Sequence, residues 1–213
     1  MTDITRTTSR HLLESKAVIL RPSEPFTWAS GWLSPIYCDN RITLSYPAVR
    51  TYIKEAFRQT ISEQFGTPEL IAGVATGAIA QGALVAESMD LPFIYVRASA
   101  KDHGRQNLVE GRLETGRKVV VVEDLVSTGG SSLKAVEAIR EAGGIVTGMV
   151  AIFTYGFPEA EKRFKEAGVR LITLSNYNTL VKMAFETDYI TGKEMDLLQE
   201  WRKDPSSWKG AQK

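Results

Sequence analysis

Two adjacent carboxylates, Glu123 and Asp124, follow four consecutive valines and precede a loop rich in Ser, Thr and Gly. Four β-branched residues in a row are typical of a buried strand. Small residues let a backbone approach an anion closely, and the N–H groups at a helix start point toward it. Carboxylates repel a bare phosphate but accept hydrogen bonds from the hydroxyls of a ribose. The string therefore predicts a sugar-phosphate site, with an ordinary turn before a Ser-capped helix as the structural alternative.

Other phosphate-binding and catalytic motifs are missing from the sequence. It contains neither Gly-x-x-x-x-Gly-Lys-Ser/Thr nor Gly-x-Gly-x-x-Gly. Ser131 to Lys134 matches Ser-x-x-Lys, but the companion strings Ser-Asp-Asn and Lys-Thr-Gly do not occur. A triphosphate or dinucleotide site of the common kinds is therefore not indicated.

A second group of candidate residues follows another apolar run. Arg97, Lys101, His103 and Arg105 are interspersed with Gly, Ser, Asp and Asn. This composition is typical of a mobile loop that carries cations, and a solvated hairpin tip is the alternative.

Regular elements must position these residues. Five short apolar runs alternate with helical segments, which predicts an α/β fold with a five-stranded, mostly parallel sheet flanked by helices. Such sheets bind ligands at the carboxyl ends of their strands, where both groups of candidates fall. His11 to Leu20 also has helical spacing. The expected strands are Leu70–Val74, Phe93–Val96, Val119–Val122, Ile145–Thr154 and Leu171–Leu174, and the expected helices begin at Pro47 or cover 78–89, 133–142 and 159–167.

Composition limits the class of protein. The 213 residues include 26 Lys and Arg against 25 Asp and Glu, and a net charge of +1 does not favour nucleic-acid or membrane binding. One cysteine, Cys38, and two histidines, His11 and His103, exclude a disulfide framework and a Cys/His zinc cluster. Without a secretory signal or an apolar run near ~20 residues, we expect a cytoplasmic protein. We expect one domain, with an N-terminal flap over roughly 1–45, a core over roughly 46–175 and a C-terminal helical segment over roughly 176–213.

The string from Val119 to Ser132 resembles the 5-phosphoribosyl 1-diphosphate (PRPP) signature of the type I phosphoribosyltransferases. The resemblance implies that family's fold, with Glu123 and Asp124 on the ribose hydroxyls and Thr128 to Ser131 on the 5-phosphate. Gly73 to Ala78 is similar to the family's diphosphate loop. The PRPP-binding residues so implied are Arg97, Lys101, His103, Glu123, Asp124, Leu125, Val126, Ser127, Thr128, Gly129, Gly130, Ser131, Thr76 and Gly77.

Two segments resemble one branch of that family, the orotate phosphoribosyltransferases. Lys-Asp-His-Gly after a strand is similar to their flexible catalytic loop, and Ser-Gly-x-x-Ser-Pro-Ile-Tyr at 30–37 to their N-terminal hood, which covers the base. The resemblance implies that Lys101, His103 and Asp124 are catalytic. It also implies a homodimer, in which the loop closes over the partner subunit's site. The matches extend from residue 26 to residue 132, about half the chain.

The sequence departs from the branch where cations are common. Ala29, Leu33 and Thr76 stand where some members carry Lys, and Tyr155 stands where several carry an Arg that helps to hold orotate. The orotate carboxylate is left without an obvious cationic partner, and Arg41 is our candidate. Ser127 matches a hydroxyl position that contacts orotate in the family.

The reaction implied by the resemblance joins orotate and PRPP to give orotidine 5′-monophosphate and diphosphate, in de novo pyrimidine (UMP) biosynthesis. Its cofactor is Mg²⁺, held mainly through PRPP with no direct protein ligand expected. Two alternatives share the fold: a PRPP- or nucleotide-binding transcriptional regulator, and a purine phosphoribosyltransferase. We expect neither nucleic acid nor membrane as a partner.

Overall fold

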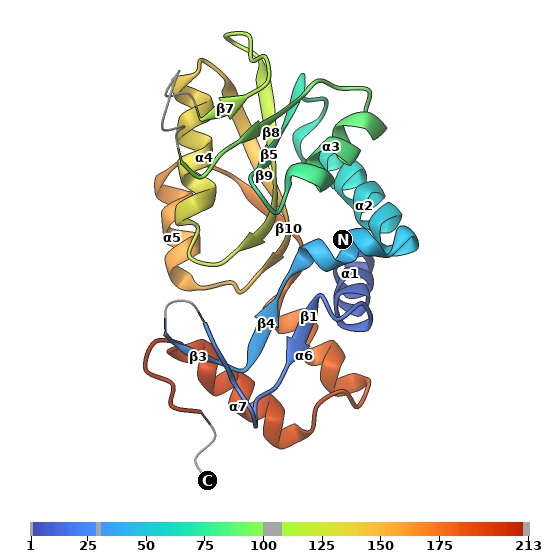
Figure 1. Cartoon of the computed structure of the whole chain (residues 1–213), viewed down its shortest axis with the longest axis vertical. Helices are drawn as coiled ribbons and strands as arrows, with labels where there is room; N and C mark the ends of the chain where they lie inside the picture. The colour runs from blue at the N-terminus through green and yellow to red at the C-terminus, as the bar shows by residue number, and fades with distance from the viewer. Residues whose placement is uncertain (1, 29–30, 100–107, 211–213) are drawn as a thin grey trace. The chain divides into compact units, whose positions relative to one another are not determined.

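The computed structural model describes residues 2–28, 31–99 and 108–210 (Figure 1). The chain divides into two compact units, a larger one of Leu44–Leu174 and a smaller one of Met1–Thr43 with Ser175–Lys213. The smaller unit thus combines the N-terminal flap with the C-terminal segment. No helix in the described ranges has both the length and the apolar character to cross a membrane.

The larger unit is built on one mostly parallel sheet. Strand β5 pairs in parallel with β6 and β8, β8 pairs in parallel with β9, and β6 pairs with β7 in the antiparallel sense. The sheet has six strands within the described ranges, so the prediction of five was wrong in number. The missed strand, β7, has only two residues, too few to produce a hydrophobic pattern. In spatial order the strands are β10 (Leu171–Asn176), β9 (Ile145–Thr154), β8 (Lys118–Val126), β5 (Leu70–Val74), β6 (Phe93–Val96) and β7 (Val109–Glu110).

Helices cover both faces of this sheet, with α2 and α3 on one side and α4 and α5 on the other (Figure 1). All four helices predicted for this part of the chain are confirmed, and Pro47 is the first residue of α2. Buried valines such as Val119 and Val121 pack in one core cluster with Val136 and Ile139 of α4. The helix bounds are α2 (Pro47–Phe65), α3 (Ile79–Ser88), α4 (Gly130–Glu141) and α5 (Pro158–Glu166).

The register of the strands decides which helix each side chain meets. Gly73 of β5 lies opposite Tyr95 of β6 and Val122 of β8, so these three residues point to the same face. That face carries α3, because a Cβ on Gly73 would lie 2.8 Å from the carbonyl oxygen of Ala78. Val121, one residue earlier in β8, belongs to the cluster on the α4 face. Side chains of the buried stretch Val119–Val122 therefore alternate between the α4 face and the α3 face.

In the smaller unit, the two ends of the chain pack together. Helix α1 packs against α6, and the Oγ atoms of Ser9 in α1 and Ser175 near the end of β10 share a buried hydrogen bond of 2.6 Å. Arg6 adds an exposed ion pair to Glu186 at 2.7 Å. The elements are α1 (Thr2–Glu14), β1 (Val18–Leu20), β2 (Phe26–Thr27), β3 (Leu33–Ser34), β4 (Ile36–Cys38), α6 (Tyr177–Glu186) and α7 (Gly192–Lys203), with η1 (Asn40–Ser45) leading into the larger unit.

The prediction of a helix from His11 to Leu20 was wrong at its C-terminal end. The helix ends at Glu14, and Lys16 has a left-handed backbone with φ of +58° that ends the helical path. The β-branched Val18 and Ile19 then pair with β4 as strand residues.

Trp201 of α7 is the largest fully buried side chain of the smaller unit. The centroids of the Trp28 and Tyr177 rings both lie 5.6 Å from that of Trp201. Its indole N–H donates to the carbonyl oxygen of Leu33 at 3.2 Å, and the Tyr177 hydroxyl donates to that of Leu198 at 2.8 Å. The indole thus joins the C-terminal helices to the β2–β3 hairpin.

Trp201→Ala is therefore expected to lower the free energy of unfolding by about 3–5 kcal/mol, because it leaves a large cavity. Trp32→Ala is the matched control, since the Trp32 side chain is an exposed indole of the same unit; its expected loss is about 1 kcal/mol. Chemical denaturation followed by circular dichroism measures both. Equal losses for the two variants would contradict the anchoring role of Trp201.

Candidate functional site

The two carboxylates at the end of β8 have different surroundings. Glu123 is buried, its Oε2 accepts a hydrogen bond from the Ser132 hydroxyl at 2.8 Å, and its Oε1 accepts from the Asp124 backbone N–H at 2.9 Å. Burial, and next the neighbouring charge of Asp124, raise the pKa of Glu123 to about 8. Glu123 therefore joins the strand end to the first turn of α4 on the α4 face of the sheet.

Asp124 is half-buried and lies against the loop between β5 and α3. A Cβ added to Gly77 would overlap the Asp124 carboxylate, so the backbone of this loop lies directly against the carboxylate. Only glycine fits at position 77 without moving the acid. Thr76, beside it, is exposed, so the predicted diphosphate loop and Asp124 share one open edge.

The loop after β8 leads directly into α4 and leaves its first turn accessible. Gly129 is the N-cap of α4 with a left-handed φ of +81°, and a Cβ there would lie 2.9 Å from the Phe164 ring. A glycine cap has no side chain to accept from the first N–H groups of the helix, so these donors can bind an anion. Ser127 and Thr128 are half-buried and Ser131 is exposed, so their hydroxyls lie around the helix start. Leu125 and Val126 are strand residues and offer only backbone atoms.

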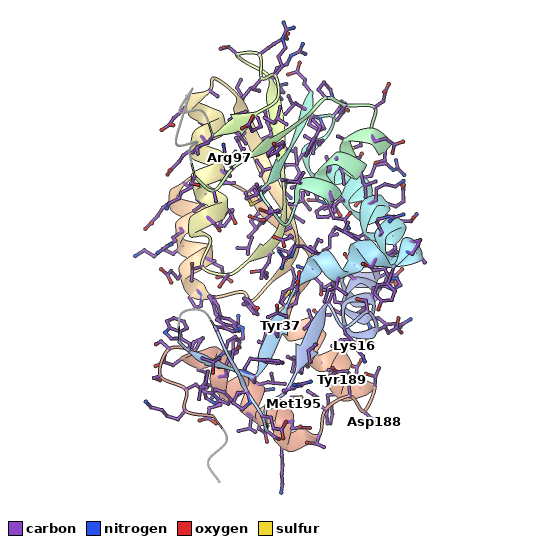
Figure 2. The ribbon with its side chains drawn as sticks, viewed as in Figure 1. Lys16, Tyr37, Arg97, Asp188, Tyr189 and Met195 are labelled. Carbon is purple, nitrogen blue, oxygen red and sulfur yellow. The ribbon has the colours of Figure 1, made fainter. Side chains whose placement is uncertain are left out.

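Arg97 follows β6 at the same edge of the sheet (Figure 2). The Ala75 N–H donates to the carbonyl oxygen of Val96 at 2.8 Å, which joins the start of the diphosphate loop to the residue before Arg97. The Arg97 side chain is 29% exposed, and its Nη1 lies 3.6 Å from Oε1 of Glu110. Strand pairing thus brings Thr76, Gly77, Arg97 and Asp124 to one edge of the larger unit.

Two predicted catalytic residues, Lys101 and His103, lie outside the described residues. Arg41 belongs to the smaller unit and makes a bidentate ion pair with Asp39, with contacts of 2.7 and 2.9 Å. This pair lowers the pKa of Asp39 and already compensates the charge of Arg41. A role of Arg41 in binding orotate stays a prediction.

Sequence reasoning missed Ser132 and the packing of Tyr155. A run of two serines, Ser131 and Ser132, does not say which one turns inward, and only the helical phase of α4 decides it. Tyr155 is a buried core ring, stacked on Phe157 with centroids 5.4 Å apart and edge-on to Phe153 at 5.6 Å. The position where several relatives carry Arg is thus an aromatic core position here.

A comparison with protein families matches residues 42–185 to the phosphoribosyl transferase domain. This match covers the sheet, the strand-end loops and both carboxylates, and it defines the class of protein.

Individual relatives narrow the class. An orotate phosphoribosyltransferase from Porphyromonas gingivalis is 60% identical over 197 residues, covering 92% of this chain and 94% of the relative. The crystal structure of orotate phosphoribosyltransferase from Aeropyrum pernix has a TM-score of 0.75 at 27% identity, over 86% of this chain and 99% of that one. Leishmania donovani UMP synthase shares the fold with a TM-score of 0.79 at 24% identity; 93% of this chain matches 42% of that longer one. The chain belongs to the orotate phosphoribosyltransferase branch of the phosphoribosyl transferase family.

The raised pKa of Glu123 predicts a pH dependence of stability. Between its ordinary pKa of 4.5 and about 8, the folded protein keeps a proton that the unfolded chain has released. The free energy of unfolding should therefore fall as the pH rises through this window, by up to about 1.4 kcal/mol per pH unit from this group.

Glu123→Gln should remove that contribution, because the amide stays neutral at every pH. Glu137→Gln, an exposed position on α4, is the control and should keep the wild-type slope. Denaturation at a series of pH values measures all three proteins. Identical slopes for wild type and Glu123→Gln would show that the buried carboxyl does not titrate in this way.

Proposed function

We propose that this protein transfers the 5-phosphoribosyl group of PRPP to orotate, giving orotidine 5′-monophosphate and diphosphate. One observation carries the proposal: the end of β8 brings together an acid for ribose hydroxyls and an open helix start for phosphate. The relatives that match nearly the whole chain supply the identity of the base.

The parts of PRPP are assigned by charge and geometry. The N–H groups at the start of α4, with the hydroxyls of Thr128 and Ser131, bind the 5-phosphate. Asp124 accepts hydrogen bonds from ribose hydroxyls, since its carboxylate lies on the open edge. Glu123 is buried and holds the loop through Ser132, and its predicted contact with the ribose hydroxyls stays a prediction. The diphosphate binds to Thr76, Gly77 and Arg97, so that Asp124 lies between the diphosphate site and the 5-phosphate site.

The reaction forms a bond between a ring nitrogen of orotate and the anomeric carbon of PRPP, as the bond from that carbon to the diphosphate oxygen breaks. The electron pair of the broken bond leaves with the diphosphate, and positive charge develops on the ribose. Catalysis then consists mainly of orientation and of stabilising charge on the leaving group. Arg97 supplies cationic charge on the diphosphate side, and Lys101 and His103 are proposed to add theirs from the loop between β6 and β7, which also excludes water.

The donor set at this edge fits Mg²⁺ that is carried mainly by the substrate. No cluster of three or more metal-ligating side chains occurs within the described ranges. Asp124 offers one carboxylate at the open edge, and Mg²⁺ commonly combines one or two carboxylates with substrate phosphate oxygens. When bound, the ion would neutralise negative charge on the diphosphate.

Three further features stay predictions: a homodimer whose loops cross to the partner subunit's site, a cytoplasmic location, and contacts of Ser127 and Arg41 with orotate. The pairing of Arg41 with Asp39 requires that Arg41 exchange one carboxylate for another if it binds orotate. Its side chain is 59% exposed, so this exchange needs no rearrangement of the core.

The direct test of the proposed function is the loss of orotate absorbance when PRPP and Mg²⁺ are added to the purified protein. We expect turnover with orotate and none with adenine, hypoxanthine or uracil. Turnover with a purine base would instead identify a purine phosphoribosyltransferase, and PRPP binding without turnover of any base would favour a regulator.

Lys101→Ala is expected to lower turnover by about 10²–10⁴-fold, the scale for losing a contact made in the transition state. Lys118→Ala, at the other end of β8, is the control and should keep wild-type turnover. Steady-state rates at saturating orotate and PRPP measure the effect. A Lys101→Ala enzyme with the full rate would refute the catalytic role of the loop.

A further inference from the structure

Arg97 and Glu110 face each other at the base of the segment between β6 and β7. Tyr95 pairs with Glu110 and Val96 with Val109, and the Arg97 N–H donates to the carbonyl oxygen of Leu108 at 2.9 Å. Because side chains alternate along strands, Arg97 and Glu110 lie on the same face of the sheet. This is the α3 face.

The ion pair between them is close, but it leaves hydrogen-bond donors of the guanidinium without an acceptor. Nη1 of Arg97 lies 3.6 Å from Oε1 of Glu110, beyond hydrogen-bond distance, and the side chains are only 29% and 26% exposed. Nη1 itself is buried and has no hydrogen-bond partner. A nearby carboxylate stabilises a partly desolvated cation, whereas a buried donor without an acceptor is costly.

The Arg41–Asp39 pair shows the contrasting arrangement. There, Nε and Nη2 of Arg41 donate to the two carboxylate oxygens of Asp39 at 2.7 and 2.9 Å, so both donors on that side of the guanidinium are occupied. At Arg97 the acid supplies charge without taking the Nη1 donor. The arrangement holds a cation in place and leaves it able to bind another anion.

We propose that Glu110 is a positioning residue, which fixes Arg97 beside the diphosphate loop so that the partly exposed guanidinium can donate to a diphosphate oxygen of PRPP. This inference rests on the proposed function, because it requires PRPP as the ligand. Glu110 acts through Arg97 and does not touch the substrate, so its loss weakens PRPP binding more than it slows the chemical step.

The first test compares Glu110→Gln with wild type in the orotate assay. The KM for PRPP should rise about tenfold, with kcat changed less than about threefold, because a held cation becomes mobile. Glu110→Asp keeps the charge on a shorter side chain and should restore part of the affinity. Glu114→Gln is the matched control: Glu114 pairs with the exposed Arg112 and Arg117 at 3.1 and 2.8 Å, and its loss should leave the KM unchanged.

The second test is a double-mutant cycle with Arg97→Ala. If Glu110 acts through Arg97, Glu110→Gln should have no further effect on the KM for PRPP in the Arg97→Ala background. Calorimetric titration with PRPP gives the same comparison without turnover, and circular dichroism checks that each variant is folded. If Glu110→Gln does not fold, Glu110→Asp replaces it in the double-mutant cycle.

Three results would overturn the inference. An unchanged KM in Glu110→Gln removes the role, and independent effects in the cycle show that Glu110 does not act through Arg97. A lowered KM shows that Glu110 competes with PRPP for Arg97. Failure of the proposed function is distinct from all three, since the wild-type protein would then show no turnover of orotate with PRPP.

Discussion

The pairing of β8 in the sheet gives two neighbouring carboxylates different surroundings. Glu123 points toward α4, where burial and the Ser132 hydroxyl surround it, and Asp124 points toward the diphosphate loop. A shift of one residue in the pairing of β8 would exchange the two acids and bury the wrong one. The four valines before them, packed on both faces, prevent that shift. The packing of the sheet core thus determines which of the two acids is buried and which lies at the site.

The same constraint explains why the sequence string is composed as it is. A second ionised acid beside the loop would repel the phosphate groups that the loop binds, and burial, together with the neighbouring charge of Asp124, keeps Glu123 largely neutral near pH 7. Gly77 and Gly129 are required because backbone approaches the Asp124 carboxylate at one and the Phe164 ring at the other. The glycines therefore serve close packing around the site as much as flexibility.

Much of the fold and of the candidate site could be predicted from the sequence, and the features that could not be predicted have physical reasons. The five longer strands and the helices of the larger unit were predicted, because each has enough residues to show a hydrophobic period. Strand β7 was missed, because two residues carry no period. The inward turn of Ser132 depends on helical phase, and the pairing of Arg41 with Asp39 depends on a local turn. The roles of Lys101 and His103 rest on the sequence resemblance and await their test.

The association of the two chain ends in one unit has a consequence for synthesis on the ribosome. Chains are made from the N-terminus, and residues of the larger unit are complete once Leu174 has been added. Helix α1 and the β2–β3 hairpin are made first, but their partners in α6 and α7 are made last. Apolar side chains such as Leu12 and Trp28 must therefore stay without these partners while the whole larger unit is made. The segment that is made before the larger unit is thus among the last to acquire its native packing.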